Sequence, residues 1–345
     1  RHLGLTQRML ATQETGTGAM GQISTLLKAV IATSLSMQAL LAIMFVPRFL
    51  TMGINPARAI WDAVFMAISV FNNAGFVILP EGLTPHVTDW WILIPIILGT
   101  TVGAIGFPVI MDVSKNLRSP RRWRLHTKLT LSTYLILAFI GALTLALTEW
   151  HNPATLGAID TPSKILNAML AGVNSRSSGL SALDVGAMHS QTHFIQDILM
   201  MIGGGSASTA GGVKVTTFAV LVLAVIAEAR GDRDIETFGR RIPTSTVRLA
   251  VAVSLLGLAM VAMSVVLLMS MTDHSLDIIL FETVSAFATV GLSTGITPNL
   301  PVAAKYVLIA LMFAGRTGSM TVAAALALRE RSRVIRMPEE QPIIG

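Results

Sequence analysis

The sequence predicts an all-α, polytopic membrane protein built from three tandem helix–loop–helix repeats. Apolar residues make up 52% of the 345 positions and charged residues only 13%, which is too apolar for a soluble domain of this length. Several apolar stretches reach the roughly 20 residues that a membrane-spanning helix needs. The same order of segments also recurs three times, so one structural unit accounts for most of the chain.

Six long apolar stretches are the candidate spans. A segment that crosses a hydrocarbon core must satisfy its backbone polar groups internally, so each stretch is expected to be helical. In chain order they are Ile23 to Val46, Trp90 to Met111, Thr130 to Thr148, an interrupted stretch from Phe194 to Ala227, Val247 to Met271, and Val302 to Leu328.

A shorter apolar segment lies between the two long stretches of each repeat. These segments are about 12 to 14 residues long, or roughly 20 Å as helix, which cannot cross a core of about 30 Å. They must re-enter, and the loops that follow them must be buried in protein or line water. The segments are Ala57 to Val70, Pro162 to Val173 and Leu276 to Ala288.

Each short segment leads into a loop centred on one glycine. Gly75, Gly179 and Gly291 recur at intervals of 104 and 112 residues. A small or hydroxylated residue, or Val290, precedes each glycine, and a bulky apolar residue that we expect to pack behind the loop follows it. The candidate filter residues are Asn72, Asn73, Ala74, Gly75 and Phe76, then Ser177, Ser178, Gly179 and Leu180, and finally Thr289, Val290, Gly291 and Leu292.

The glycine loops suit the chemistry of potassium selection. A dehydrated potassium ion is held by backbone carbonyls that replace its water, and glycine permits the backbone angles that this requires. The carboxyl ends of the short helices would add partial negative charge. None of the loop sequences carries a carboxylate, which favours carbonyl selection. The alternative is that these are ordinary tight turns between helices. That alternative could explain one such loop, but it explains poorly three loops that each follow a short re-entrant segment.

The interrupted stretch is broken by residues rich in glycine, serine and threonine. Five glycines in ten residues disfavour helix by roughly 1 kcal/mol each. In a membrane such a segment must lie in the protein interior. It is either an intramembrane gate beneath the loops or a packing kink where helices approach closely. Its residues are Gly203, Gly204, Gly205, Ser206, Ala207, Ser208, Thr209, Ala210, Gly211 and Gly212.

Basic residues cluster in alternate connections, which predicts topology rather than nucleic-acid binding. By the positive-inside rule these connections and both termini are cytoplasmic, in a plasma membrane protein. The clusters are Arg118, Arg121, Arg122, Arg124 and Lys128, then Arg230, Arg233, Arg240, Arg241 and Arg248, and finally Arg329, Arg331, Arg333 and Arg336.

The composition argues against an enzyme. Cysteine is absent from the sequence, which excludes thiolate metal sites and cysteine nucleophiles. The seven histidines lie outside the apolar stretches or at their ends, so an intramembrane hydrolase lacks a base. We expect no bound cofactor, and potassium as the only metal, held as cargo.

Long ordered segments give the sequence a resemblance to the KtrB/TrkH superfamily of potassium-translocating subunits, closest to the KtrB branch. They are Ser69 to Phe76, Arg176 to Gly179, Gly203 to Phe218, Phe238 to Pro243 and Ser285 to Gly295. The resemblance implies potassium uptake through four helix–pore loop–helix repeats around one ion pathway, and it favours the gate over the packing kink.

The resemblance also divides the chain. This chain shows three repeats, so we expect it to lack the first, and three loops cannot close a fourfold ring. The middle loop has Ser177, Ser178, Gly179 and Leu180 where the family commonly has threonine, alanine, glycine and phenylalanine. The expected parts are a cytoplasmic segment (1–22), pore repeats at 23–117, 118–230 and 231–330, and a cytoplasmic tail (331–345).

Two cations fall within or beside the apolar stretches. An intramembrane cation is costly enough to suggest a function. The resemblance implies that Arg316 faces the pore below the filter and hydrogen-bonds carbonyls of the gate. Lys214 either belongs to the gate or extends its ammonium toward the cytoplasm.

The resemblance further implies a homodimer in the bilayer, docked on a cytosolic nucleotide-binding ring of the KtrA/TrkA type, while sodium dependence stays open. The main alternative is a secondary transporter with broken midplane helices, which would have inverted rather than same-direction repeats. A non-conducting truncated homologue is the other alternative.

Overall fold

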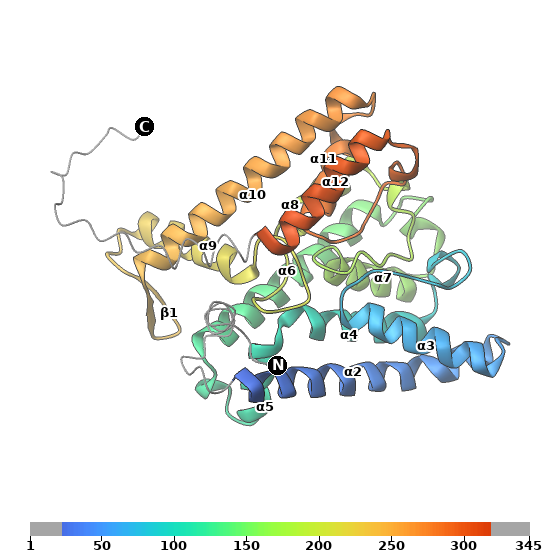
Figure 1. Cartoon of the computed structure of the whole chain (residues 1–345), viewed down its shortest axis with the longest axis horizontal. Helices are drawn as coiled ribbons and strands as arrows, with labels where there is room; N and C mark the ends of the chain where they lie inside the picture. The colour runs from blue at the N-terminus through green and yellow to red at the C-terminus, as the bar shows by residue number, and fades with distance from the viewer. Residues whose placement is uncertain (1–22, 319–345) are drawn as a thin grey trace.

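The computed structural model describes residues 23–318, which are mostly helical (Figure 1). The expected segments 1–22 and 331–345, with the last basic cluster, lie outside the described residues. The helices are α2 (Ile23–Thr51), α3 (Pro56–Phe71), α4 (Trp90–Ile105), α5 (Phe107–Lys115), α6 (Leu125–Glu149), α7 (Thr161–Asn174), α8 (Ser190–Met201), α9 (Val215–Arg230), α10 (Thr244–Met271), α11 (Leu276–Phe287) and α12 (Val302–Phe313), followed by a π-helical turn at Ala314–Gly318.

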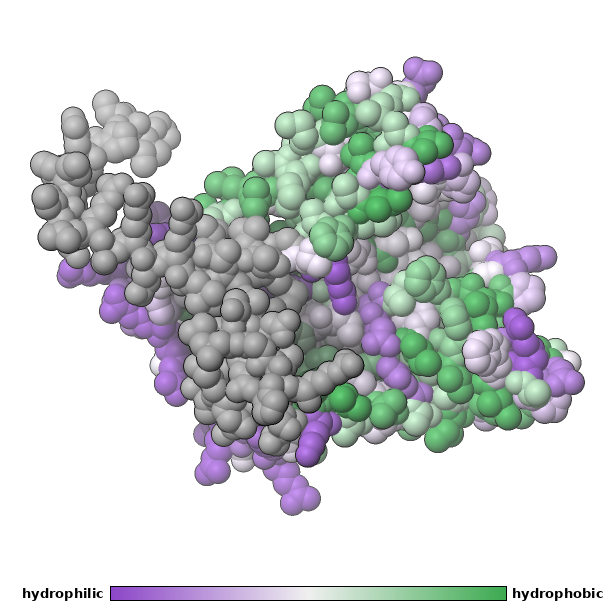
Figure 2. All heavy atoms as spheres, viewed as in Figure 1, coloured by the Kyte–Doolittle hydropathy of each residue, from purple (hydrophilic) through white to green (hydrophobic). Residues whose placement is uncertain are grey.

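Three helices of the described part are long and apolar enough to cross a membrane on their own: Leu27–Thr51, Leu125–Glu149 and Thr244–Met271. Their outer surfaces are apolar, as a bilayer allows. Figure 2 shows hydrophobic residues over α10 and α2, and hydrophilic residues gathered toward the two ends of the molecule. Leu255, Leu258 and Val266 of α10, for example, are all exposed.

The short helices α3, α7 and α11 begin and end within one or two residues of the bounds predicted from the sequence. Asn55 caps α3, its side chain accepting from the Ala57 amide at 3.0 Å, and Pro56 supplies the first turn. Asp160 caps α7 in the same way, and hydrogen bonds from Ser163 hold its pKa below the usual range. These caps let a helix too short to span the membrane begin at a defined residue.

Two apolar clusters hold the short helices in place. Leu41, Phe45 and Phe49 recur every four residues along α2, and this buried stripe packs against α3 and α4. The second cluster joins α6, α8, α10, α11 and α12 around residues such as Phe281 and Phe287. Because α7 packs against both α4 and α6, it joins the helices around the first cluster to those around the second.

The expected span from Trp90 to Met111 is not continuous. It breaks at Gly106, where φ is +97°, and α5 leaves α4 at an angle of 95°. A Cβ at Gly106 would lie 2.6 Å from the carbonyl oxygen of Ser206, so only glycine admits this close approach. The break therefore brings the start of α5 into contact with the glycine-rich segment, where the Phe107 amide donates to the Ala207 carbonyl.

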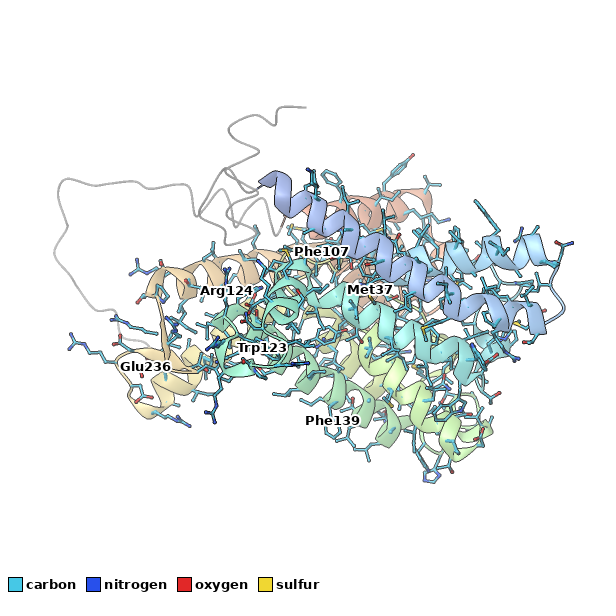
Figure 3. The ribbon with its side chains drawn as sticks, turned by 90° about the horizontal axis from the view of Figure 1, so that it is seen from below. Met37, Phe107, Trp123, Arg124, Phe139 and Glu236 are labelled. Carbon is cyan, nitrogen blue, oxygen red and sulfur yellow. The ribbon has the colours of Figure 1, made fainter. Side chains whose placement is uncertain are left out.

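The connection from α5 to α6 is held by Asp112. Its Oδ2 accepts from the Arg124 amide at 2.9 Å and from the Thr127 hydroxyl at 2.6 Å, and the Trp123 indole donates to the Asn116 carbonyl at 3.1 Å. Figure 3 shows Trp123 and Arg124 at this junction, with Glu236 farther out.

The all-α prediction needs one correction. Strands β1 (Ile235–Thr237) and β2 (Arg240–Ile242) form an antiparallel hairpin between α9 and α10. Phe238 and Gly239 both have positive φ, the geometry of a tight two-residue hairpin turn. Figure 1 places the hairpin at one end of the molecule, beyond the helices.

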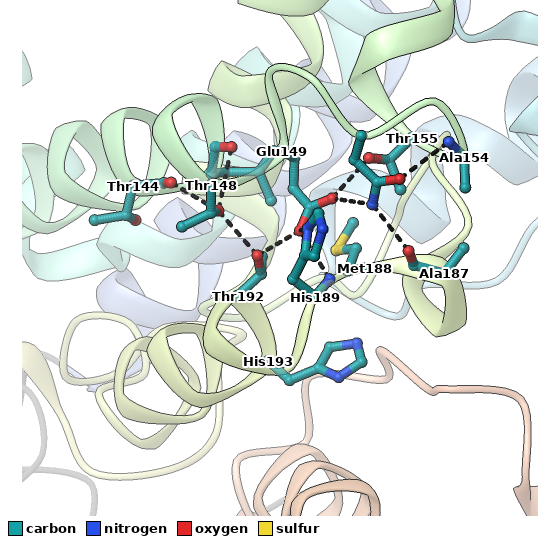
Figure 4. Close-up of polar contacts among 12 residues, drawn as sticks. Thr144, Thr148, Glu149, Ala154, Thr155, Ala187, Met188, His189, Thr192 and His193 are labelled. Carbon is teal, nitrogen blue, oxygen red and sulfur yellow. Dashed lines mark hydrogen bonds and ion pairs between the residues drawn. The ribbon is translucent and has the colours of Figure 1, made fainter.

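A buried carboxylate locks the far end of α6 (Figure 4). Glu149 is 0% exposed. It accepts hydrogen bonds from the Thr192 hydroxyl, from the His189 amide at 2.9 Å, from the Thr155 hydroxyl at 2.7 Å and from the Asn152 amide nitrogen at 2.6 Å. The network ties α6 to the start of α8.

Replacing Glu149 with alanine is expected to destabilise the folded protein by about 3 kcal/mol. The substitution leaves several buried donors without an acceptor, and each such loss costs roughly 1–3 kcal/mol. Thermal unfolding in detergent measures the change, with the exposed Glu228→Ala as control. Equal melting temperatures for both variants would contradict a stabilising role for the network.

Candidate functional site

The three glycine loops meet at one place although they are distant in sequence. They are called here the first loop (72–76), the middle loop (177–180) and the third loop (289–292). A Cβ at Gly75 would lie 2.4 Å from the Ser178 carbonyl oxygen, and one at Gly179 would lie 2.3 Å from the Val290 carbonyl oxygen. The middle loop therefore presents a carbonyl to the glycine of the first loop, and the third loop presents one to the glycine of the middle loop.

The backbone at these glycines excludes most other residues. Gly75, Gly179 and Gly291 have φ values of 75°, 62° and 96°. Asn73 and Thr289, each two residues before a glycine, also have positive φ, at 51° in both cases. An unusual backbone shared by equivalent positions indicates a conformation that the surrounding structure imposes.

Each loop is braced by a side chain of the helix before it. The Ser69 hydroxyl donates to the Phe76 carbonyl at 2.7 Å, and the Ser285 hydroxyl donates to the Leu292 carbonyl at 2.6 Å. In the middle loop the Asn174 amide nitrogen donates to the Leu180 carbonyl at 2.6 Å. The carbonyl after each glycine is thus turned back toward its helix, which leaves the carbonyls at and before the glycine for another partner.

The bulky residues after the glycines differ in burial. Leu180 and Leu292 are 2% and 6% exposed and pack behind their loops as expected. Phe76 is 68% exposed, so the expectation was wrong for the first loop. The reason is local, because the Ser69 bond holds the backbone of residue 76 while no described element covers its ring.

The glycine-rich segment, called here the 203–212 loop, packs directly against two glycine loops. Its Thr209 hydroxyl accepts from the Asn73 side-chain nitrogen at 2.6 Å and lies 3.0 Å from the Gly103 carbonyl of α4. A Cβ at Gly211 would lie 2.1 Å from Thr289 Oγ1. The loop therefore touches both the first and the third loop.

Both predicted cations contact the 203–212 loop. Arg316 donates from Nη1 to the Thr209 carbonyl. Lys214 donates from Nζ to the Ala210 carbonyl at 2.6 Å, so its ammonium is held at the loop rather than extended toward an aqueous end. Gly315 lies beside Arg316, and a Cβ there would be 1.7 Å from the Phe287 carbonyl, which brings this turn against α11.

A comparison with known protein families shows to which family the chain belongs. Residues 3–335 match the family described as TrkH, cation transport protein. The chain belongs to the TrkH family. It is therefore a multi-pass membrane protein of a transporter family rather than an enzyme, which agrees with the exclusion of a hydrolase.

Named relatives of the TrkH family match the whole chain. The Ktr system potassium uptake protein B of Bacillus subtilis (strain 168) is 36% identical over all of this chain and 77% of its own length. The protein of the same name from Vibrio alginolyticus is 33% identical over 99% of this chain and 75% of its own length. The crystal structure of the potassium transporter TrkH from Vibrio parahaemolyticus has a TM-score of 0.70 at 17% identity, covering 91% of this chain and 66% of that one. The fold is thus TrkH-like.

Some residues of this TrkH-type site were missed from the sequence. Ser69, Asn174 and Ser285 have a periodic signal, since each lies six or seven residues before the carbonyl that it holds. The burial of Arg176 was not predicted either, because the sequence marks this residue only as the start of the segment Arg176 to Gly179. It is 0% exposed, its guanidinium lies 3.8 Å from the ring centre of Tyr134, and its nitrogens have no hydrogen-bond partner among the described residues.

Proposed function

We propose that the chain is the translocating subunit of a Ktr/Trk-type potassium uptake system, with the three glycine loops as its selectivity filter. The observation that carries the proposal is the convergence of the loops, in which Gly75 faces the Ser178 carbonyl and Gly179 faces the Val290 carbonyl. Backbone carbonyls gathered in this way replace the hydration shell of a cation. The potassium uptake named in two relatives supports the same choice.

The 203–212 loop, with Lys214 and Arg316, is proposed as the gate. Its contact with the first and third loops supports this assignment, because any ion leaving the filter on that side must pass it. Arg316 adds a positive charge that opposes a cation. Opening would require the loop to release Asn73 and the Gly103 carbonyl, and transport would then follow the membrane potential, at about 2.3 kcal/mol per charge per 100 mV.

The finer organisation is proposed on the same basis. The pore repeats are 23–117, 118–230 and 231–330, arranged around one ion pathway with both termini cytoplasmic. The subunit forms a homodimer and binds a cytosolic nucleotide-binding ring of the KtrA/TrkA type. The relatives' Ktr system names support such partner subunits. The chain itself carries potassium as cargo and no cofactor.

Potassium uptake tests the proposal directly. The full-length protein that contains these residues would be produced in a bacterial strain without its own potassium uptake systems, together with its cytosolic partner. We expect growth at low potassium and saturable uptake that prefers potassium over sodium. The empty vector is the control. Absence of uptake above the vector, with the protein present in the membrane, would rule the proposal out.

A further inference from the structure

A small cavity lies behind the middle loop, at the seam with the third loop. Its volume is about 10 Å³, and its lining includes Asn167, Asn174, Ser175, Gln196 and Leu292. These residues come from α7 and its end, from α8, and from the third loop. A polar cavity of this size holds about one water molecule.

Four lining side chains carry an oxygen atom that lacks a hydrogen-bond partner within the described part of the chain. They are Asn167 Oδ1, Asn174 Oδ1, Ser175 Oγ and Gln196 Oε1. All four residues are at most 5% exposed. Buried polar atoms in native proteins are nearly always paired with protein or with ordered water. Four unpaired oxygens around one cavity therefore point to an occupant.

The amide orientations at two of these residues are fixed by other bonds. The Asn167 side-chain nitrogen donates to the Val87 carbonyl at 2.7 Å and to the Ser163 carbonyl at 2.8 Å. The Asn174 nitrogen donates to the Leu180 carbonyl at 2.6 Å. In each case the remaining amide atom is the oxygen, which only accepts. The occupant must therefore supply hydrogen atoms or positive charge.

Hydrogen-bond counting favours water over a cation. We propose that one water molecule occupies the cavity as a fixed part of the middle loop's support. Its two hydrogens can be donated to two of the amide oxygens, and its own oxygen can accept the Ser175 hydroxyl hydrogen. A cation in the cavity would lie against Ser175, whose neighbour in the chain is the buried, positively charged Arg176. The residues that line the cavity include no carboxylate to balance the charge of the cation.

This water would position the middle loop, an inference that rests on the proposed filter. Asn174 holds the Leu180 carbonyl with its nitrogen and would hold the water with its oxygen. The water in turn would contact Gln196 of α8. The Leu180 carbonyl would then be fixed relative to α8 as well as to α7, and the spacing of the middle and third loops would depend on the bound water.

High-resolution structures of the full-length protein test the site itself. A wild-type map should show one peak within hydrogen-bond distance of Asn167 and Asn174, and the peak should be absent in Ser175→Ala. The Ser175 hydroxyl has no hydrogen-bond partner among the described residues, so this variant removes little besides the water contact. An empty cavity in the wild type, or an anomalous peak there after soaking in thallium, would overturn the proposal.

Ion discrimination tests the positioning role. Ser175→Ala and the similarly sized Gln196→Leu should each lower the potassium-over-sodium permeability ratio about fivefold, the equivalent of one hydrogen bond. Ser254→Ala is the matched control, because its hydroxyl is also unpaired among residues 23–318 but lies on α10, whose residues do not line the cavity. Unchanged ratios in both variants would refute the role. The water peak is measured without transport, so its absence would leave the filter assignment standing.

Discussion

Replacing Gly179 with serine is expected to lower the potassium-over-sodium permeability ratio by roughly tenfold or more. A Cβ at this position would lie 2.3 Å from the Val290 carbonyl oxygen and 2.7 Å from the carbonyl carbon of Gly291. A side chain also costs about 1 kcal/mol at a positive φ. The middle and third loops must therefore separate, and the carbonyl cage loses its fit to a dehydrated ion. Reversal potentials in mixed potassium and sodium solutions measure the ratio.

Two further glycines separate crowding from backbone strain. Gly53 has φ of 77° in the turn between α2 and α3, and a Cβ there would meet nothing within 4 Å, so Gly53→Ser is the control for strain alone. Gly291→Ser combines a φ of 96° with open space and should have a smaller effect than Gly179→Ser. An effect at Gly53 as large as that at Gly179 would refute the filter assignment.

Deleting residues 204–210 is expected to raise potassium flux by at least roughly tenfold. The deletion removes Thr209 with its bonds to Asn73, the Gly103 carbonyl and Arg316, each worth about 1 kcal/mol toward the closed state. The chain can be rejoined, because a Cβ at Gly203 would lie only 1.9 Å from the Gly211 carbonyl oxygen. Flux in proteoliposomes with and without the cytosolic partner measures both the rate and its regulation.

Point variants test whether the rise in flux comes from losing the contacts of the loop or from shortening it. Thr209→Val keeps the loop and removes the hydroxyl, so it should raise flux less than the deletion. Ser208→Ala is its matched control, since the bonds of that hydroxyl in the described part of the chain stay within the loop, to the Gly205 carbonyl and from the Ala210 amide. If the deletion leaves flux unchanged, the segment is a packing kink.

The sequence predicted the local parts of the site well. Short apolar segments with a proline in the first turn define α3 and α7 within one or two residues, because length and capping are local properties. The break of the long apolar stretch at residues 203–212 follows equally from its glycine content. Both features depend on residues that are adjacent in the chain.

Tertiary contacts could not be predicted in this way. The bend at Gly106 is one glycine in an apolar run, and its reason is the Ser206 carbonyl about a hundred residues later. The roles of Ser69 and Ser285 were missed because a serine inside a helix has several common explanations. The hairpin at residues 235–242 was missed because its strands have only three residues each.

The braced carbonyls bear on which sequence changes this protein tolerates. Ser69, Asn174 and Ser285 hold the backbone of the residue after each glycine, not its side chain. The exposed side chain of Phe76 can therefore be replaced by leucine without releasing the carbonyl. The geometry of each loop then depends on the helix residue seven places earlier, or six in the middle loop, rather than on the bulky residue itself.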